Sequence, residues 1–278
     1  MIKQIIYCGL IGLFCLKIIP AGAQVVQKDA PELKKINVIE HLGDTIPMDL
    51  AFTNSKGQSI MLSDLFGPGK PVLLTLAYYE CPMLCTFVLN GLSKGLSELN
   101  FIPGTDFQMI TISIDPKETW NLAATKQKNQ QAAVGKKFPE DGWQFLVGTQ
   151  ENIHRLADAV GFVYYYDRAR DEYAHPAVSF VLSDKGMITR YLYGIEHTGN
   201  DLRLALLEAS KGEIGDTIDK IVLYCYHYDP DAGGYVLFAG NVMRLGGVIT
   251  MLFLGVALGL LWRREKRKRH ATADGQNQ

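Results

Sequence analysis

Cysteine is scarce in this chain of 278 residues: there are five, and Cys8 and Cys15 fall within the first 23 residues. The other three are too few to form a framework of disulfides for a domain of this length. The net charge is only -1, so no basic excess indicates a nucleic-acid partner. Internal repeats and low-complexity segments are also lacking, which excludes a repeat architecture. What remains is one ordinary globular domain with appendages.

The first 23 residues have the three parts of a secretory signal peptide. Lys3 supplies a positive n-region, residues 5–16 form an apolar h-region, and residues 21–23 form an A-x-A cleavage site. Lys17 interrupts the apolar run, which argues against a membrane span here. An uncleaved N-terminal anchor is the alternative, because h-regions and anchors grade into each other.

The other end of the chain has the pattern of a membrane-spanning helix. Residues 245–262 carry no charge and residues 235–243 upstream are also uncharged, so we predict a transmembrane helix at 235–262. A basic run at 263–270 follows, and by the positive-inside rule the tail at 263–278 stays in the cytoplasm. Together with the signal peptide, this predicts a single-pass protein of the cytoplasmic (inner) membrane with its domain on the periplasmic side.

Between these appendages, hydrophobic periodicity predicts an α/β domain at residues 45–212, after a loose lead-in at 24–44 and before a membrane-proximal connector at 213–234. The domain begins with a β-hairpin around the turn-rich residues 54–57. The alternation of strands and helices that follows predicts a sheet covered by helices on both faces. Further strands are expected at 72–77, 107–114, 143–147, 162–166, 175–182 and 187–193, and helices at 82–99, 117–133, 151–160 and 198–212.

Residues 73–91, LLTLAYYECPMLCTFVLNG, predict a buried strand, a turn, and a helix that opens on Cys81 and Cys85. Residues four apart lie on one face of a helix, about 6 Å apart along its axis, which suits a disulfide or one shared soft metal ion. Pro82 suits the first helical position, and a helix N-terminus favours the thiolate form of cysteine. The alternative is a pair of small buried side chains that never ionise.

Four motifs, in this order, resemble the Sco/SenC family. They are C-P-x-x-C after a strand, S-I-D-P at the end of the next strand, W-Q-F-L-V-G, and a histidine before a β-hairpin around D-K-G. The resemblance covers residues 45–212 and implies a thioredoxin-like fold. It also implies a copper protein that helps to assemble the copper centre of cytochrome c oxidase.

The resemblance further implies which residues bind the metal. By position, Cys81, Cys85 and His175 would be the copper ligands, and Asp115 in S-I-D-P would lie close to the site. Asp115 could equally just end its strand, and a histidine at the start of a strand is often only a surface or capped residue. Family members often continue S-x-D-P with R-D-T-P, whereas residues 117–120 here are K-E-T-W.

The chemistry of these side chains points in the same direction. Thiolates select soft ions such as Cu(I) or Zn(II), and imidazole suits both metals. Two sulfurs and one nitrogen satisfy trigonal Cu(I), whereas structural zinc usually takes four ligands and the sequence offers no good fourth. The expected partners are the copper-binding subunit of cytochrome c oxidase or another copper protein, and a thiol reductant that keeps the cysteines reduced. The same pair could instead cycle through a disulfide, as in a thiol–disulfide oxidoreductase.

Several other side chains leave alternatives open. Met83 lies between the cysteines, where its thioether could assist copper, although packing is the simpler expectation. His154 and His197 are expected on the surface. Cys225 and His227 could contact copper or a partner, but we favour a membrane-proximal segment whose tyrosines lie at the interface.

Overall fold

The computed structural model of the chain describes residues 36–81, 83–210, 226–229, 234–237 and 239–274. The predicted signal peptide and most of the predicted lead-in lie outside the described residues. Pro82, Cys225 and most of the predicted connector also lie outside them.

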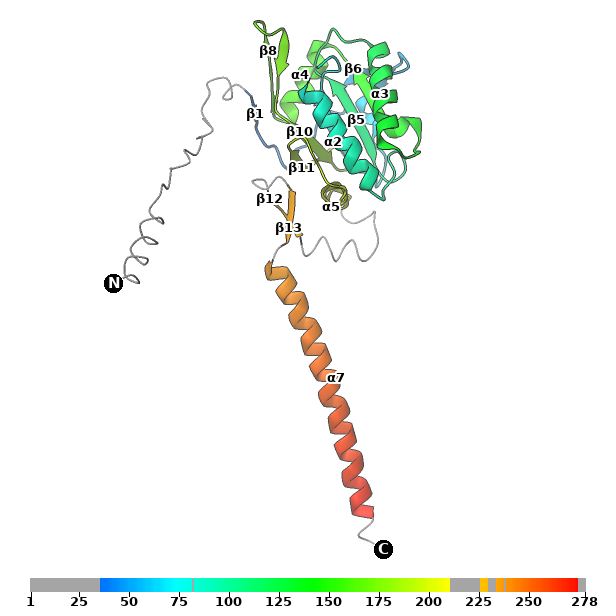
Figure 1. Cartoon of the computed structure of the whole chain (residues 1–278), viewed down its shortest axis with the longest axis vertical. Coiled ribbons are helices and arrows are strands. Elements are labelled where there is room, and N and C mark those ends of the chain that lie inside the picture. The colour runs from blue at the N-terminus through cyan, green and yellow to red at the C-terminus, as the bar shows by residue number, and fades with distance from the viewer. Residues whose placement is uncertain (1–35, 82, 211–225, 230–233, 238, 275–278) are drawn as a thin grey trace, which may run out of the picture. The chain divides into compact units, whose positions relative to one another are not determined.

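A mixed sheet forms the centre of the domain (Figure 1). It has seven strands in the order β11-β10-β4-β5-β6-β2-β3. The middle strands β4, β5 and β6 run parallel, and the other neighbours pair antiparallel. Every residue of β4 and β10 is buried, which explains why both are nearly continuous apolar runs. The strands are β2 (Ala51–Asn54), β3 (Ser59–Met61), β4 (Val72–Ala77), β5 (Gln108–Ser113), β6 (Trp143–Val147), β10 (Val178–Leu182) and β11 (Ile188–Tyr193).

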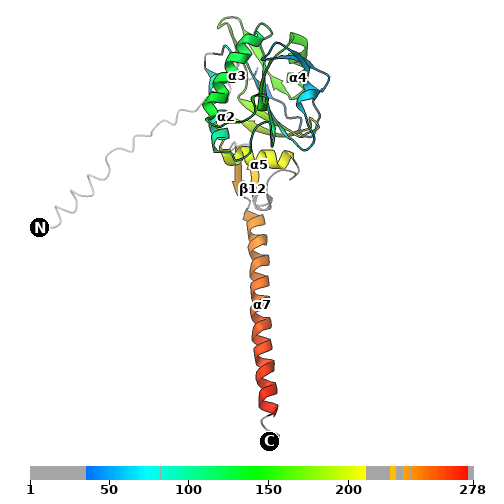
Figure 2. The same cartoon turned by 90° about the vertical axis from the view of Figure 1, so that its right-hand side faces the viewer.

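Helices cover both faces of this sheet (Figure 2). Neighbouring residues of a strand point to opposite faces, and Leu73 of β4 belongs to a buried cluster with α2, α3 and α5. Leu74 belongs to a second cluster with α4. The predicted α/β architecture with an N-terminal hairpin, β2–β3, is confirmed. The helices are α2 (Leu84–Glu98), α3 (Trp120–Val134), α4 (Gln150–Ala159) and α5 (Gly199–Ala209), with 3-10 turns at Leu62–Leu65 and Glu140–Gly142.

Part of the predicted lead-in is folded onto the domain. β1 (Asn37–Val38) pairs antiparallel with β7 (Phe162–Val163), and the Ile39 amide donates to the Gly161 carbonyl at 2.9 Å. Gly161 has a φ of +64°, and a Cβ there would lie 1.7 Å from the Ile39 carbonyl oxygen. Glycine is therefore required at this position, and the expectation of a loose lead-in is wrong for residues 37–39.

Another hairpin, which we did not predict, lies directly before the predicted histidine ligand. β8 (Tyr165–Asp167) pairs with β9 (Glu172–Ala174), and Asp171 in the turn has a φ of 57°. The strand predicted at 162–166 is in fact two strands, β7 and β8. The prediction missed the break because a run of tyrosines has no polar–apolar alternation that would show where one strand ends. His175 lies in the link between β9 and β10 rather than on a strand.

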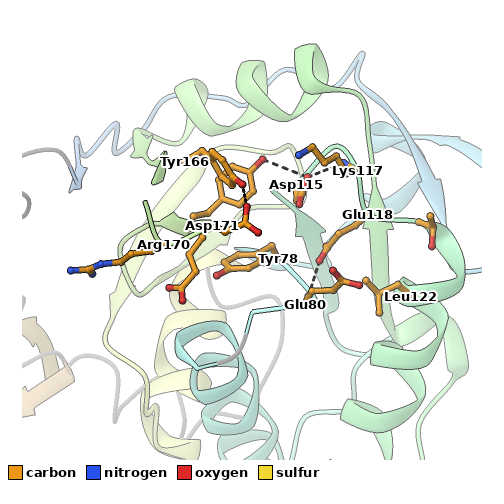
Figure 3. A pocket seen from close by; sticks show the side chains of 12 residues that line it. Tyr78, Glu80, Asp115, Lys117, Glu118, Leu122, Tyr166, Arg170 and Asp171 are labelled. Atoms are coloured by element: carbon orange, nitrogen blue, oxygen red, sulfur yellow. Dashed lines mark hydrogen bonds between the residues drawn. The ribbon is translucent and has the colours of Figure 1, made fainter. Parts of the chain in front are cut away.

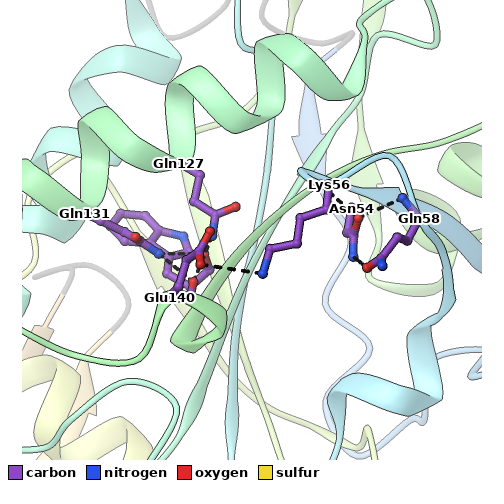
Figure 4. A network of polar contacts seen from close by, with 7 residues as sticks. Asn54, Lys56, Gln58, Gln127, Gln131 and Glu140 are labelled. Carbon is purple, nitrogen blue, oxygen red and sulfur yellow. Dashed lines mark hydrogen bonds and ion pairs between the residues drawn. The ribbon is translucent and has the colours of Figure 1, made fainter.

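A network of polar side chains connects the β2–β3 turn to the chain after α3 (Figure 4). Lys56 in the turn lies 3.5 Å from Glu140, and the amides of Gln127 and Gln131 donate to the Glu140 carbonyl, each at 2.8 Å. The ion pair is exposed and contributes little. Gln127 is buried, so its hydrogen bond is the stronger constraint. Asn54 closes the turn by accepting from two backbone amides.

The C-terminal part contains a short hairpin and a long helix. β12 (Tyr226–Asp229) pairs antiparallel with β13 (Gly234–Leu237), and α7 (Ala239–Asp274) follows. Within the described residues, α7 is the one helix long and apolar enough to cross a membrane, over Met243–Leu260. It begins later than the span predicted at 235–262, because the first residues of that span lie in β13, and it continues through the basic run.

His197 is buried, contrary to the expectation of a surface residue. It is 4% exposed, and neither ring nitrogen has a hydrogen-bond partner among the described residues. Burial lowers the pKa of His197 to about 4, although the nearby Asp201 acts in the opposite direction. The imidazole is therefore neutral in the folded protein at neutral pH.

Stability should consequently depend on pH through His197. The folded-state pKa of about 4 lies below the unfolded value of 6.5. As the pH falls from 6.5 to 4, His197 therefore takes up a proton in the unfolded chain but not in the folded one. Up to about 3 kcal/mol of the free energy of unfolding is lost over this range. His197→Leu should flatten this part of the pH dependence. The measurement is the denaturation midpoint of the full chain in detergent at several pH values from about 7.5 to 4.5. An unchanged slope in the variant would exclude His197 as the source.

Candidate metal centre

The site begins where β4 ends. Residues 78–80 form a loop, Cys81 follows, and α2 begins at Leu84 with Met83 as its N-cap. Cys85 lies in the first turn of the helix, but Cys81 precedes the helix, so the predicted placement of both on one helical face is wrong. The loop nevertheless brings the two together, because the Cys81 Sγ accepts the Cys85 backbone N–H at 3.3 Å.

Both cysteines are buried and form no disulfide, with Cys81 7% and Cys85 1% exposed. The Cys85 Sγ accepts the backbone N–H of Tyr78 at 3.4 Å. A hydrogen bond from the Cys85 thiol lowers the pKa of Cys81, whereas burial raises the pKa of Cys85. The opposite shifts make Cys81 the more acidic of the two thiols.

His175 closes the group from the link between β9 and β10. Its Nε2 lies 2.9 Å from the Cys85 Sγ, and its Nδ1 lies 3.0 Å from the Pro176 carbonyl oxygen. Because a carbonyl can only accept, Nδ1 carries the proton of the neutral ring, so Nε2 is an acceptor and competes with the Cys81 sulfur for the single thiol hydrogen of Cys85. The ring is 5% exposed and meets Tyr78 edge-on, with ring centroids 6.1 Å apart.

The structure thus brings together the three side chains that we predicted as ligands. One ligand atom each from Cys81, Cys85 and His175 lies within 4.8 Å of the others. Among the residues that the structure describes, no further cysteine, histidine or carboxylate joins this group. Two sulfurs and an imidazole nitrogen fit a soft ion such as Cu(I), which three donors satisfy in a trigonal site.

Glu118 anchors the loop that carries Cys81, and we did not predict this role. Its carboxylate accepts the backbone N–H of Tyr79 at 2.9 Å and that of Glu80 at 2.7 Å, and it also accepts the Ser113 hydroxyl. Burial raises the pKa of Glu118, and these hydrogen bonds act against that rise. Because Glu118 follows β5, the parallel neighbour of β4, its carboxylate connects the ends of the two strands.

Asp115 does not join the ligand group. Its Oδ1 accepts the Lys117 backbone N–H at 2.9 Å and lies 3.5 Å from the Tyr173 hydroxyl. The first contact closes the local turn after β5, so Asp115 ends its strand, which is one of the two roles that we expected for it. The second places the carboxylate in the wall of a neighbouring cleft.

This cleft, of about 540 Å³, shares Tyr78 with the cysteine site (Figure 3). Its wall is acidic and aromatic. The Lys117 ammonium lies over the ring of Tyr166, 5.6 Å from its centroid. Burial and the Asp115 carboxylate raise the pKa of Tyr173 to about 12. The charged lining comprises five carboxylates, from Glu80, Asp115, Glu118, Asp171 and Glu172, against the two cations of Lys117 and Arg170.

The remaining candidates fall into three groups. Met83 is 64% exposed, so the expectation that it packs is wrong. His154 is exposed, as predicted, with its ring beside that of Tyr164. The backbone of His227 lies on β12 and Cys225 lies outside the described residues, so the suggestion for these two residues stays a prediction.

Comparison with known proteins identifies the family. A sequence model described as SCO1/SenC matches residues 41–203, which is more than half of the chain. This chain belongs to the SCO1/SenC family. A search of curated proteins gave no match.

Several solved structures are similar to this SCO1/SenC chain. A protein from Aquifex aeolicus VF5, named as a candidate electron transfer protein, is 30% identical over 60% of this chain and 94% of its own, with a TM-score of 0.54. Arabidopsis thaliana ScoI with copper bound is 21% identical over 55% and 90%, with a TM-score of 0.45. BsSco, described as a member of the Sco family of cytochrome c oxidase assembly proteins, is 22% identical over 63% and 98%, with a TM-score of 0.47. The predicted family and thioredoxin-like fold are confirmed.

Removing the Glu118 carboxylate should weaken metal binding although Glu118 is not in the ligand group. Glu118→Ala leaves the amides of Tyr79 and Glu80 without their acceptor, so the loop before Cys81 loses its fixed position. Cu(I) affinity should then fall by about 10-fold to 100-fold, measured by competition with a chromophoric chelator. Glu151→Ala, which removes an exposed carboxylate on α4, is the control. An affinity of Glu118→Ala within about twofold of wild type would show that the loop holds its position without this carboxylate.

Cys81 should react with alkylating reagents at unusually low pH in the metal-free protein. The hydrogen bond from Cys85 favours its thiolate, whereas an ordinary thiol with a pKa of about 8.5 loses reactivity about tenfold per unit below that value. Cys85→Ala removes the donor and should shift the Cys81 profile upward. The measurement is the rate of iodoacetamide labelling, assigned to each cysteine by mass spectrometry. A wild-type Cys81 that titrates like an ordinary thiol would contradict this account of the pair.

Proposed function

We propose that this protein is a membrane-anchored copper carrier that binds copper through Cys81, Cys85 and His175. It would deliver the ion to the copper-binding subunit of cytochrome c oxidase or to another copper protein. The observation that supports this most strongly is the meeting of two buried sulfurs with an imidazole whose Nε2 faces them. A pair of cysteines that only reduces disulfides needs no such nitrogen.

The donor set favours copper over structural zinc. Structural zinc is held by four protein ligands, whereas the two-cysteine, one-histidine set of some catalytic zinc sites is completed by a water. The described residues offer two thiolates and one imidazole in a buried group, and trigonal Cu(I) is satisfied by that number. The proton on Cys85 must leave when the ion binds, so loading should weaken as the pH falls.

The setting of this chemistry is also a proposal. Arabidopsis ScoI is described with copper bound, and BsSco is described among cytochrome c oxidase assembly proteins. If residues 1–23 are a signal peptide and α7 spans the membrane, the basic tail at 263–278 lies in the cytoplasm and the domain lies on the periplasmic side. A thiol reductant is then needed to keep both cysteines reduced. Asp115 would lie near the metal without binding it.

A thiol–disulfide oxidoreductase is the second candidate. The asymmetry of the pair supports it, because a thiolate at Cys81 and a buried thiol at Cys85 correspond to an attacking and a resolving cysteine. His175 distinguishes the two functions, since a copper site needs its Nε2 and a dithiol reaction does not.

The test loads the full chain in detergent with Cu(I) under anaerobic, reducing conditions. The carrier function predicts one ion per chain, loss of binding in the Cys81→Ser/Cys85→Ser double variant, and an affinity at least about tenfold weaker in His175→Ala. His154→Ala, which changes an exposed histidine, should bind like wild type. Binding that is indifferent to His175, together with efficient reduction of disulfide substrates, would favour the oxidoreductase instead.

A further inference from the structure

Met83 occupies an unusual place for a large apolar side chain. The residue is 64% exposed. No other large hydrophobic residue of the described chain before α7 is as exposed; the next are Ile39 at 54% and Phe87 at 50%. Scattered exposed apolar residues are ordinary on a protein surface. The informative feature is therefore the position of Met83, which lies between the two cysteines of the metal-ligand group.

The ligand group itself is almost completely buried. The exposed fractions are 7% for Cys81, 5% for His175 and 1% for Cys85. A soft ion passed between proteins or taken from a chelator must form a new bond as an old one breaks, because it is poorly held by water and hard donors. Exchange with this buried group therefore requires a soft donor that solvent and partners can reach.

We propose that the Met83 thioether is the entry and exit ligand for Cu(I), an inference that rests on the copper-carrier function. Thioethers select Cu(I) and, unlike cysteine or histidine, have no proton to lose before they bind. Met83 is two residues from Cys81, so their Cα atoms lie at most about 7 Å apart. The three rotatable bonds of methionine allow its sulfur to move between solvent and the neighbouring thiolate.

The step is a ligand exchange without electron transfer. Bonds from Cu(I) to the Met83 sulfur and the Cys81 thiolate form as the bonds to the donor break. The ion then binds the Cys85 sulfur and the His175 Nε2, the Cys85 proton passes to the buffer, and the bond to Met83 breaks. Release follows the same steps in reverse toward a ligand of the client.

Docking of a partner is the competing role for this methionine. The Phe87 backbone N–H donates to the Met83 carbonyl at 3.1 Å, and both side chains are exposed one helical turn apart. They could form an apolar contact for another protein. The two roles are separable, because a small chelator exchanges metal with the site but has no surface that docks on Met83 and Phe87.

The experiment follows Cu(I) exchange between the full chain in detergent and bicinchoninate by stopped flow, in both directions. Met83→Leu removes the sulfur while nearly keeping size and hydrophobicity. An interaction made only during exchange changes the forward and reverse rates by one factor and leaves the equilibrium unchanged. Loading and release should both slow by about tenfold, while the Kd stays within about twofold.

Two matched variants serve as controls. Met61→Leu changes a methionine on β3 that is 38% exposed, and Phe87→Leu trims the apolar neighbour of Met83. Both should exchange Cu(I) with the chelator at wild-type rates.

Equal exchange rates in Met83→Leu and wild type would overturn the proposal. A fall in equilibrium affinity comparable to that of His175→Ala would also overturn it, because Met83 would then be a permanent ligand. Wild-type protein that fails to bind Cu(I) would overturn the copper-carrier function together with this inference, and the equilibrium titration of wild type identifies that case before any rate is compared.

Discussion

In the neutral imidazole, the hydrogen bond from the His175 Nδ1 to the Pro176 carbonyl leaves the Nε2 lone pair facing the Cys85 sulfur. Without this bond the imidazole could present its N–H to the sulfur, and the group would have no nitrogen donor for a metal. The backbone N–H groups of Tyr78 and Cys85 meanwhile point at the two sulfurs. The chain thus supplies hydrogen bonds that favour the metal-binding form of each of the three side chains.

Two features of the fold bring these groups together. The cysteines follow β4, and Glu118 holds their loop to the end of β5, so the parallel pairing of the two strands determines where the sulfurs lie. His175 lies on the other side of β4, in the link between the β8–β9 hairpin and β10. β10 is the antiparallel neighbour of β4. The pairing of β4 with a parallel strand on one side and an antiparallel strand on the other is therefore what makes the site.

The sequence predicted the fold where the hydrophobic pattern is strong, as in β4, β5 and the helices that cover them. It also predicted the two cysteines and His175, because their types and order restrict the chemistry. The two- and three-residue strands β1, β8 and β9 could not be predicted, since tertiary contacts rather than local preference decide such pairings. The role of Glu118 could not be predicted because its partners are backbone amides of a loop that is distant in sequence. The burial of His197 could not be predicted because its polar, turn-like segment is buried only by packing against α2.

The most direct test of the three-ligand site is X-ray absorption spectroscopy at the copper edge of the Cu(I)-loaded full chain. The account predicts a first shell of two sulfurs and one nitrogen, with the outer-shell scattering of an imidazole ring that disappears in His175→Ala. A shell of sulfur alone, unchanged by that substitution, would contradict the account, because the Nε2 of His175 would then have no part in holding the ion.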